Sequence, residues 1–324
     1  MSRFARDDEV ATWHDDGWVL LDGLIGTDDI DAAAADLPAM FPTAEQYHAD
    51  PEGETERWLG RPPAPRDDEY VWPPAGPGFR PEQHRWRAEF PLRGTGALNR
   101  LCVHPAIVDF MERALQTTDL RLYQAGLSAK YAGTVNYEQP MHTDRNHSWL
   151  PTLPGPPWWH VESFLYLSDV HDGNAPTHLV SVRDSVGRAT TVPLIFRKQD
   201  PDIYQAEQPA AGVRGSLLAY RSDVFHRAVD LTEPGSARFL LNVSYRLTSH
   251  DWVGFTSAQS RASAPEWTAF VEGSTPRELE LFGFPKPGHP IWNEALLDAT
   301  AVKYPNLDLT QWRRALAARP GASD

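Results

Sequence analysis

The sequence predicts a protein of β-strands with flanking helices. Runs of residues that alternate between apolar and polar, or that are continuously apolar, are typical of half-buried and fully buried strands. Such runs lie at residues 18–21, 120–131, 163–168, 215–220 and 236–246. With 324 residues, the chain is long enough to bury a sizeable core.

Helix signals flank these runs. The first expected helix spans residues 7–15. The second begins at Thr27, a suitable N-cap, and ends at Pro38, which cannot continue a helix. The third spans 105–116 and has proline at its first position, where the missing N–H has no partner to lose. Two more helices are expected at 265–272 and 310–318.

The charge of the chain restricts its partners. Acidic residues outnumber basic ones by 44 to 30, so the net charge is −14 and the pI is about 5.3. Nucleic-acid binding requires a basic face, and anionic membrane surfaces attract basic segments, so neither partner is expected. Solubility is the simplest reason for the charge.

No feature of the sequence indicates export or membrane insertion. The first eight residues lack the apolar core of a signal peptide, and no run approaches the ~18 apolar residues that span a bilayer. The one cysteine, Cys102, stands between two apolar residues and is expected to fill the core. We therefore expect a cytoplasmic, reducing location.

Three residues form a candidate metal site. His142 and Asp144 are two positions apart, and on an extended strand such side chains project from one face and can converge. His226, after the strand-like run 215–220, offers a third ligand. Two histidines and one carboxylate, with the other positions open, are the ligands of non-haem Fe(II) oxygenases. The His-x-Asp tripeptide alone is equally compatible with an exposed turn.

An arginine strengthens this interpretation. Arg238 lies 12 residues after His226, at the start of the run 236–246, which is expected to be a buried strand. A buried guanidinium requires a planar anion that accepts both of its hydrogen bonds. The far carboxylate of 2-oxoglutarate is such an anion.

The order of these residues resembles that in the phytanoyl-CoA dioxygenase family of Fe(II)/2-oxoglutarate-dependent oxygenases: His142, Asp144, His226, Arg238. Residues 15–25 and 225–238 are also similar to the family's N-terminal strand and distal motif, and the resemblance covers most of residues 7–250. It implies a mainly β fold with flanking helices, namely a double-stranded β-helix, which is a cupin-like jelly roll of two facing sheets.

The resemblance also implies the chemistry. Fe(II) would be held by the two histidines and Asp144, with 2-oxoglutarate and O2 as cosubstrates. Oxidation of 2-oxoglutarate to succinate and CO2 would accompany hydroxylation of an unactivated C–H bond in a small-molecule substrate, either a secondary metabolite or a lipid-like molecule. Desaturation, cyclisation and epoxidation use the same ligands, so they stay open as alternative outcomes.

Further candidates for binding the cosubstrate lie on two strands. Gln124 and Lys130 share one face of the run 120–131, which faces the cofactor pocket in the resembling family, and Phe164 falls where the family often places an aromatic residue. His147 and His160 are rival metal ligands, and we expect them to lie around the site rather than in it.

The chain departs from the family's pattern in one place near the site. The family often has a hydroxyl two residues after the distal histidine, where this chain has Ala228. Arg238 is therefore expected to rely on another partner, such as Ser244 or a tyrosine.

We expect one domain over residues 1–324, with two lid-like insertions. Prolines and tryptophans crowd residues 42–95 and 145–160, and proline-rich composition disfavours regular structure. Long loops in a compact domain are often functional. Covering the mouth of the barrel is the role that we expect for both.

Two other classes of function fit the same three ligands. A jelly-roll module that binds a structural metal or a sugar would carry out no redox chemistry, but it would leave Arg238 unexplained. A hydrolase could use water bound to zinc. It would need neither 2-oxoglutarate nor O2, so withholding either one separates the two enzymes.

Overall fold

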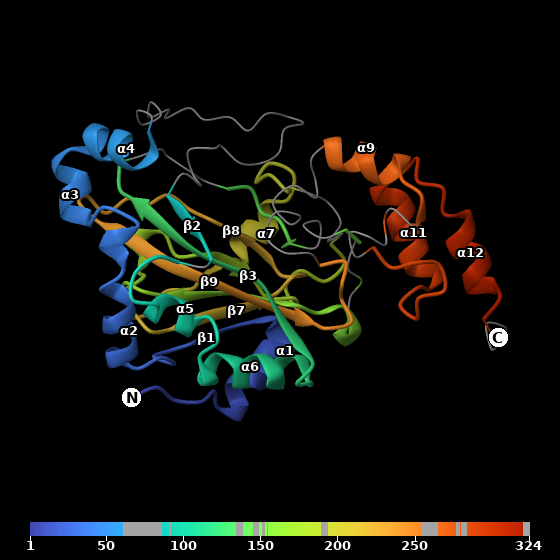
Figure 1. Ribbon diagram of the computed structural model, residues 1–324, viewed down its shortest axis with the longest axis horizontal. Helices are drawn as coiled ribbons and strands as arrows, with labels where there is room; N and C mark the ends of the chain where they lie inside the picture. The colour runs from blue at the N-terminus through green and yellow to red at the C-terminus, as the bar shows by residue number, and fades with distance from the viewer. Residues whose placement is uncertain are drawn as a thin grey trace.

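The computed structural model describes residues 1–60, 86–90, 92–133, 139–144, 149–150, 153, 155–188, 194–253, 265–276, 279 and 284–319. Its strands form two antiparallel sheets, one of six strands and one of three. The helices α1 (Asp7–Asp16), α5 (Ala97–Leu101) and α6 (Pro105–Leu115) lie on one side of the large sheet, while the strand β8 (Phe225–Arg227) and the helix α7 (Pro201–Gln205) lie on its other side (Figure 1).

The large sheet has the order β1 (Trp18–Leu21), β7 (Leu217–Arg221), β4 (Val161–Tyr166), β9 (Ala237–Leu247), β3 (Leu120–Tyr131) and β2 (Arg87–Glu89). Its longest pair, β3 with β9, runs from Leu120 opposite Leu247 to Tyr131 opposite Ala237. A register shift between Leu122 and Gln124 interrupts this pair. Because the shift adds a residue to β3, it changes which side chains face each side of the sheet.

The small sheet has the order β6 (Gln208–Pro209), β5 (His178–Val180) and β8 (Phe225–Arg227). Two isolated bridges extend it beyond β8: His142 pairs with His226, and Met141 pairs with Ile195. Residues 141–142 therefore lie next to the strand that carries the distal histidine.

The two faces of the large sheet bury different sets of side chains. On one face, β-strand residues such as Leu127 and Leu241 form the largest core cluster with residues of the helices α1 (Asp7–Asp16), α2 (Thr27–Ala34), α5 (Ala97–Leu101) and α6 (Pro105–Leu115). On the other face, Leu218 and Leu240 pack with Leu179 of β5. The second face is thus the interior between the sheets.

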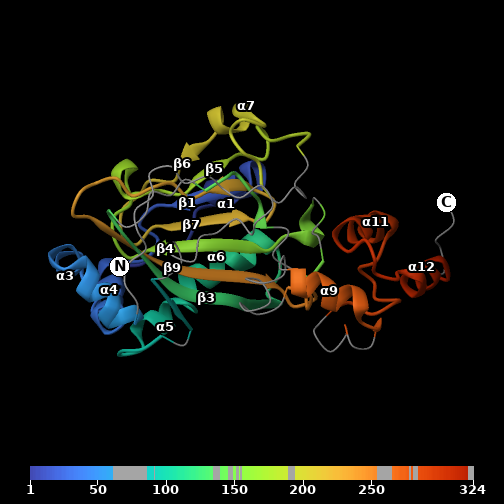
Figure 2. The ribbon, with the colours of Figure 1, turned by 90° about the horizontal axis from the view of Figure 1, so that it is seen from above.

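The C-terminal helices form a separate layer beyond one end of the sheets, as both views show (Figures 1 and 2). They are α9 (Pro265–Gly273), α11 (Glu294–Lys303) and α12 (Thr310–Ala317). Their core is rich in tryptophan, and it includes Trp149 and Trp158, from the region after the first two ligand candidates. None of the helices that the structure describes is long and apolar enough to cross a bilayer.

Most of the expected elements are confirmed. The long strand at 120–131 and the helix from Pro105 have the expected bounds within one residue. Thr27 is the first residue of α2, not its cap, because Gly26 has the extended backbone of a cap residue. Cys102 is fully buried, as expected of a core residue.

The expectation of no regular structure at 42–95 is wrong at both ends. Residues 44–59 form α3 (Ala44–Ala49) and α4 (Pro51–Leu59), and residues 87–89 form β2. Thr43 and Asp50 cap the two helices with their side chains, and Pro51 stands in the first turn, where proline is tolerated. The dense prolines between 62 and 81 lie outside the described residues.

Candidate metal centre

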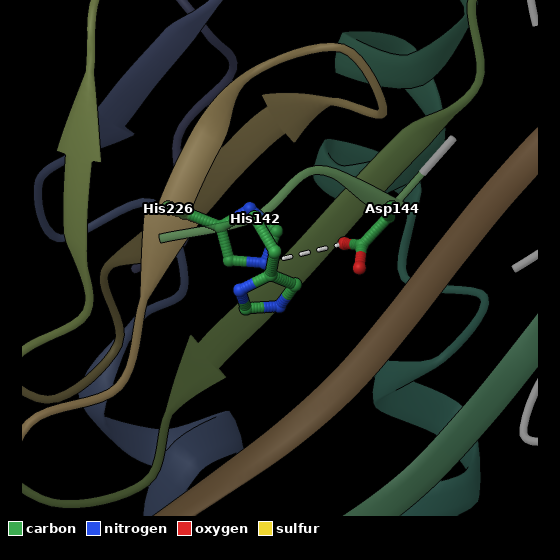
Figure 3. Close-up of side chains that lie close together, drawn as sticks. All are labelled: His142, Asp144 and His226. Atoms are coloured by element: carbon green, nitrogen blue, oxygen red, sulfur yellow. Dashed lines mark ion pairs between the residues drawn. The ribbon is translucent and has the colours of Figure 1, made fainter. Parts of the chain in front are cut away.

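The three predicted ligands come together in the interior (Figure 3). One ligand atom from each of His142, Asp144 and His226 lies within 4.8 Å of the others. The side-chain atoms His226 Nε2 and Asp144 Oδ2 are 3.4 Å apart. The residues are only 4%, 7% and 6% exposed, so the site is largely removed from water. Among the described residues, no other histidine, cysteine, aspartate or glutamate group has this arrangement.

The backbone holds the two histidines side by side. The N–H of His142 donates to the carbonyl of His226 at 3.1 Å, and the N–H of His226 donates to the carbonyl of His142 at 2.8 Å. Side chains of directly opposed residues lie on the same face of a sheet. The two imidazole rings accordingly have their centroids 4.3 Å apart.

Each imidazole is oriented in the same way. Nδ1 of His142 lies 3.0 Å from the carbonyl of Pro140, and Nδ1 of His226 lies 3.0 Å from the carbonyl of Val224. A carbonyl can only accept, so each Nδ1 carries the proton and each Nε2 keeps a lone pair. This is the arrangement in which histidine binds a metal through Nε2.

A tyrosine that the sequence reasoning did not single out adjoins the ligands. The hydroxyl of Tyr220, on β7, donates to Asp144 Oδ2 at 3.1 Å and lies 3.5 Å from His226 Nε2. Burial, together with the negative charges of Asp144 and Glu162, raises the pKa of Tyr220 well above its ordinary value. The phenol is therefore a neutral hydrogen-bond donor at physiological pH.

A buried carboxylate, Glu162, lies next to this tyrosine on the neighbouring strand. Glu162 of β4 stands opposite Tyr220 of β7 and accepts hydrogen bonds from Ser244, at 2.7 Å, and from the hydroxyl of Tyr123. Nε2 of His160 is 3.6 Å away. A glutamate inside the otherwise uncharged strand 161–166 is the signal by which the sequence could have identified this cluster.

Two partly buried cations, Lys130 and Arg238, lie side by side on the interior face. They are directly opposed in the pairing of β3 with β9. Burial, and then the charge of Arg238, lower the pKa of Lys130 to about 7, while burial lowers the pKa of Arg238 to about 10. The side chains donate to the carbonyls of Val229 and Ala175, respectively.

The guanidinium of Arg238 retains an unused donor. Its Nε is buried and has no hydrogen-bond partner in the part of the chain that the structure describes. Leaving a buried donor unpaired costs free energy, and a bound anion would remove that cost. Two adjacent desolvated cations with an unused donor are suited to a carboxylate ligand.

The other candidates fall around this interior. Gln124, opposite Ser244, lies on the same partly buried face as Lys130, and the ring of Phe164 lies 6.2 Å from that of Tyr220. The hydroxyl of Ser244 is taken by Glu162, so it does not serve Arg238. Tyr166 is the tyrosine that lies close enough to Arg238 to interact with it electrostatically.

The rival histidines are not part of the ligand cluster. His160 lies beside Glu162, and His147 lies outside the described residues. A further histidine, His178, pairs with Arg227 in the small sheet, and its Nδ1 lies 3.2 Å from Glu207. Glu207 also receives two hydrogen bonds from Arg227, the residue after the distal histidine, at 2.5 and 2.7 Å.

Comparison with known proteins supports the fold. No protein-family model matches the chain. No curated protein matches it either. Among solved structures, it is similar to the non-heme alpha ketoglutarate dependent carbocyclase SnoK from nogalamycin biosynthesis, with a TM-score of 0.52 and 15% identity over 74% of this chain and 83% of SnoK.

It is also similar to EctD from S. alaskensis. The apo form of EctD gives a TM-score of 0.52 and 13% identity, covering 78% of this chain and 84% of EctD. The form with 2-oxoglutarate and 5-hydroxyectoine gives 0.52 and 14%, covering 76% and 80%. At these identities the likeness is one of fold.

The chain therefore has two antiparallel sheets with flanking helices, in a fold similar to that of SnoK and EctD. The strands that the structure describes form two separate sheets and do not show a closed barrel. Membership of the phytanoyl-CoA dioxygenase family in particular stays a prediction.

Proposed function

We propose that this protein is an Fe(II)- and 2-oxoglutarate-dependent oxygenase that hydroxylates a small molecule. The observation that carries the proposal is the convergence of two Nε2 atoms and one carboxylate in a buried site. The likeness to SnoK and EctD, structures of a 2-oxoglutarate-dependent enzyme and of a protein crystallised with 2-oxoglutarate, supports it.

The donor set fits Fe(II). Two neutral imidazoles and one carboxylate occupy three positions of an octahedral ion and leave the other three open. The carbonyls that hold each Nδ1–H fix the rings before metal arrives, as outer-shell partners do in metalloproteins. His142, Asp144 and His226 would be the ligands.

The cation pair fits 2-oxoglutarate. Arg238 and Lys130 are paired on the interior face of the large sheet. The Nε of Arg238 is buried and has no hydrogen-bond partner among the described residues. We propose that both bind the far carboxylate of 2-oxoglutarate. Lys130 would then supply the contact that the family often obtains from a hydroxyl at the position of Ala228.

When bound, iron would supply the oxidation of 2-oxoglutarate by O2 to succinate and CO2, coupled to oxidation of the substrate. The residues of this chain orient and protect that chemistry. The buried walls exclude water, which strengthens the electrostatic interactions inside the site. Trp149 and Trp158, both buried against the C-terminal helices, help to close one end of the interior.

We also propose that the substrate is a small molecule without a large anionic group. The net charge of −14 would repel a coenzyme A thioester, whose phosphates require a basic rim. The part of the site nearest Tyr220 is acidic, with Asp144 and Glu162 both close to it. A substrate rich in hydroxyl or amino groups fits such a wall better than an acyl thioester does.

Iron binding and cosubstrate turnover test the proposal. Protein prepared without oxygen is expected to bind about one Fe(II) per chain, and exposure to O2 with 2-oxoglutarate is expected to yield succinate even without the substrate, at a slow rate. His142→Ala and His226→Ala are expected to lose both, while His178→Ala, which changes a histidine of the same small sheet, is expected to keep both. Full iron occupancy in the first two variants would contradict the assignment. Release of a hydrolysed product without O2 would favour the hydrolase.

A further inference from the structure

The hydroxyl of Tyr220 lies close to two of the three ligand atoms. It is 3.1 Å from Asp144 Oδ2 and 3.5 Å from His226 Nε2, and these two atoms are 3.4 Å from each other. Asp144 has further interactions besides the hydrogen bond from Tyr220. The phenol is thus built into the metal centre without being one of its three ligands.

The position of Tyr220 is fixed from several sides. It is 2% exposed and stands opposite Glu162 in the pairing of β7 with β4. Its ring packs on His226, with centroids 4.6 Å apart, and on Phe164, with centroids 6.2 Å apart. A phenol packed on two rings and set in a strand cannot turn away from the carboxylate without disturbing its neighbours.

We propose that Tyr220 is a positioning residue that keeps Asp144 bound to the metal through a single oxygen. This inference rests on the proposed function. A hydrogen bond to a carboxylate oxygen fixes the plane of the group and the direction in which its two oxygens point. The carboxylate is then held against rotating to present both oxygens.

Binding of Asp144 through one oxygen matters because it determines how many coordination positions of the metal stay open. Two histidines and a carboxylate bound through one oxygen leave three positions of an octahedral ion. Two are needed by the keto and carboxylate oxygens of 2-oxoglutarate, and one by O2. A carboxylate bound through both oxygens would leave only two positions, which 2-oxoglutarate would fill completely, so none would remain for O2.

Tyr220→Phe removes the hydroxyl and keeps the ring. Tyr245→Phe is the matched control, because Tyr245 is a buried tyrosine of the same sheet whose hydroxyl donates at 2.7 Å to a backbone carbonyl, that of Cys102. Both full-length variants are loaded with Co(II), whose visible spectrum reports its coordination, and separately with Fe(II) in the absence of oxygen. 2-Oxoglutarate is then titrated into each, and thermal unfolding shows that each is folded.

For Tyr220→Phe we expect an altered Co(II) spectrum before 2-oxoglutarate is added, and a 2-oxoglutarate affinity changed by roughly tenfold to a hundredfold, the range in which losing an outer-shell partner changes metal affinity or activity. Tyr245→Phe is expected to match the wild type in both measurements. If Tyr220→Phe also matched the wild type in both, the inference would be wrong while the proposed function stood. If the wild-type protein bound neither metal nor 2-oxoglutarate, the proposed function itself would be wrong.

Discussion

His142 and His226 exchange two backbone hydrogen bonds, although 84 residues separate them in the chain. The small sheet therefore sets the spacing of the two imidazoles, and the carbonyls of Pro140 and Val224 set their orientation. The folded chain presents both Nε2 atoms to the same place, so little rearrangement is needed for a metal to bind. Such preorganisation is what gives a metal site its precise geometry.

Arg238→Ala is expected to weaken 2-oxoglutarate binding strongly. Removing one partner of a buried charge pair costs roughly 2–5 kcal/mol, which is a loss of about thirtyfold or more in affinity. Arg246→Ala is the matched control, because Arg246 is on the same strand but lies 3.5 Å from the exposed Asp251. Titration of the Fe(II) protein with 2-oxoglutarate measures both. A larger loss in Arg246→Ala would mean that the cosubstrate anchor has been misplaced.

The ion pair behind the metal centre predicts a loss of stability in acid. Burial would raise the pKa of Glu207, but hydrogen bonds and charges from Arg227 and His178 outweigh it and lower the pKa from 4.5 to about 2. A carboxyl group with a lowered pKa stabilises the fold above its unfolded-state pKa and loses that contribution as the pH falls. The contribution is about 3 kcal/mol, and it disappears between pH 4.5 and about 2.

Urea unfolding of the wild type and Glu207→Gln at a series of pH values checks this. The stability difference between them is expected to be largest above pH 4.5 and to shrink as the pH falls toward 2. Glu294→Gln, which breaks the exposed pair with Arg313, is expected to have little effect at any pH. If the difference in unfolding free energy between the wild type and Glu207→Gln did not change with pH, the ionisation of Glu207 would not contribute to stability.

The C-terminal helices are expected to stabilise the region that follows the metal ligands. The hydroxyl of Tyr304, at the end of α11, donates to the carbonyl of Trp149 at 2.8 Å, and the Trp149 N–H donates to the carbonyl of Trp252 at 3.2 Å. Tyr304→Phe removes a bond worth about 0.5–1.5 kcal/mol, so amide exchange at Trp149 is expected to quicken by about twofold to tenfold. Tyr245→Phe, which loses a similar bond to the carbonyl of Cys102, should leave that exchange unchanged.

Asp144 predicts oxygen rather than halogen transfer. Related iron halogenases have a small residue in place of the carboxylate ligand, so that chloride can bind the metal. In this chain a tethered carboxylate is already within reach of the metal position, and a free halide must compete with it. The wild-type protein is expected to form no chlorinated product at any chloride concentration, as judged by mass spectrometry. Asp144→Gly is expected to lose hydroxylation, and a chlorinated product of the wild type would overturn the prediction.

The sequence was sufficient to select the three residues that converge, His142, Asp144 and His226, because the His-x-Asp pair is a local feature and the order of the three resembles that in a known family. Apolar periodicity predicted β3 and α6 almost to the residue. The sequence was not sufficient for contacts that depend on strand register. Tyr220 stands opposite Glu162 only because β7 pairs with β4, and Lys130 meets Arg238 only because β3 pairs with β9.

The proline-rich region shows a different limit of local reasoning. Composition argued against regular structure over the whole of 42–95, yet its first part is helical because Thr43 and Asp50 provide caps at the starts of α3 and α4. The packing of Trp149 against the C-terminal helices was likewise not visible in the sequence. It depends on a tertiary contact between segments 155 residues apart, joined by Tyr304.

The most direct test of the account is the visible absorption of the Fe(II) protein when 2-oxoglutarate is added without oxygen. Chelation of 2-oxoglutarate to Fe(II) produces a metal-to-ligand charge-transfer band that neither component shows alone. We predict that the band appears with one 2-oxoglutarate per chain, is absent in His226→Ala, and is present in His178→Ala. Failure of the band to appear in the iron-loaded wild-type protein would contradict the central claim that His142, Asp144 and His226 hold an iron that binds 2-oxoglutarate.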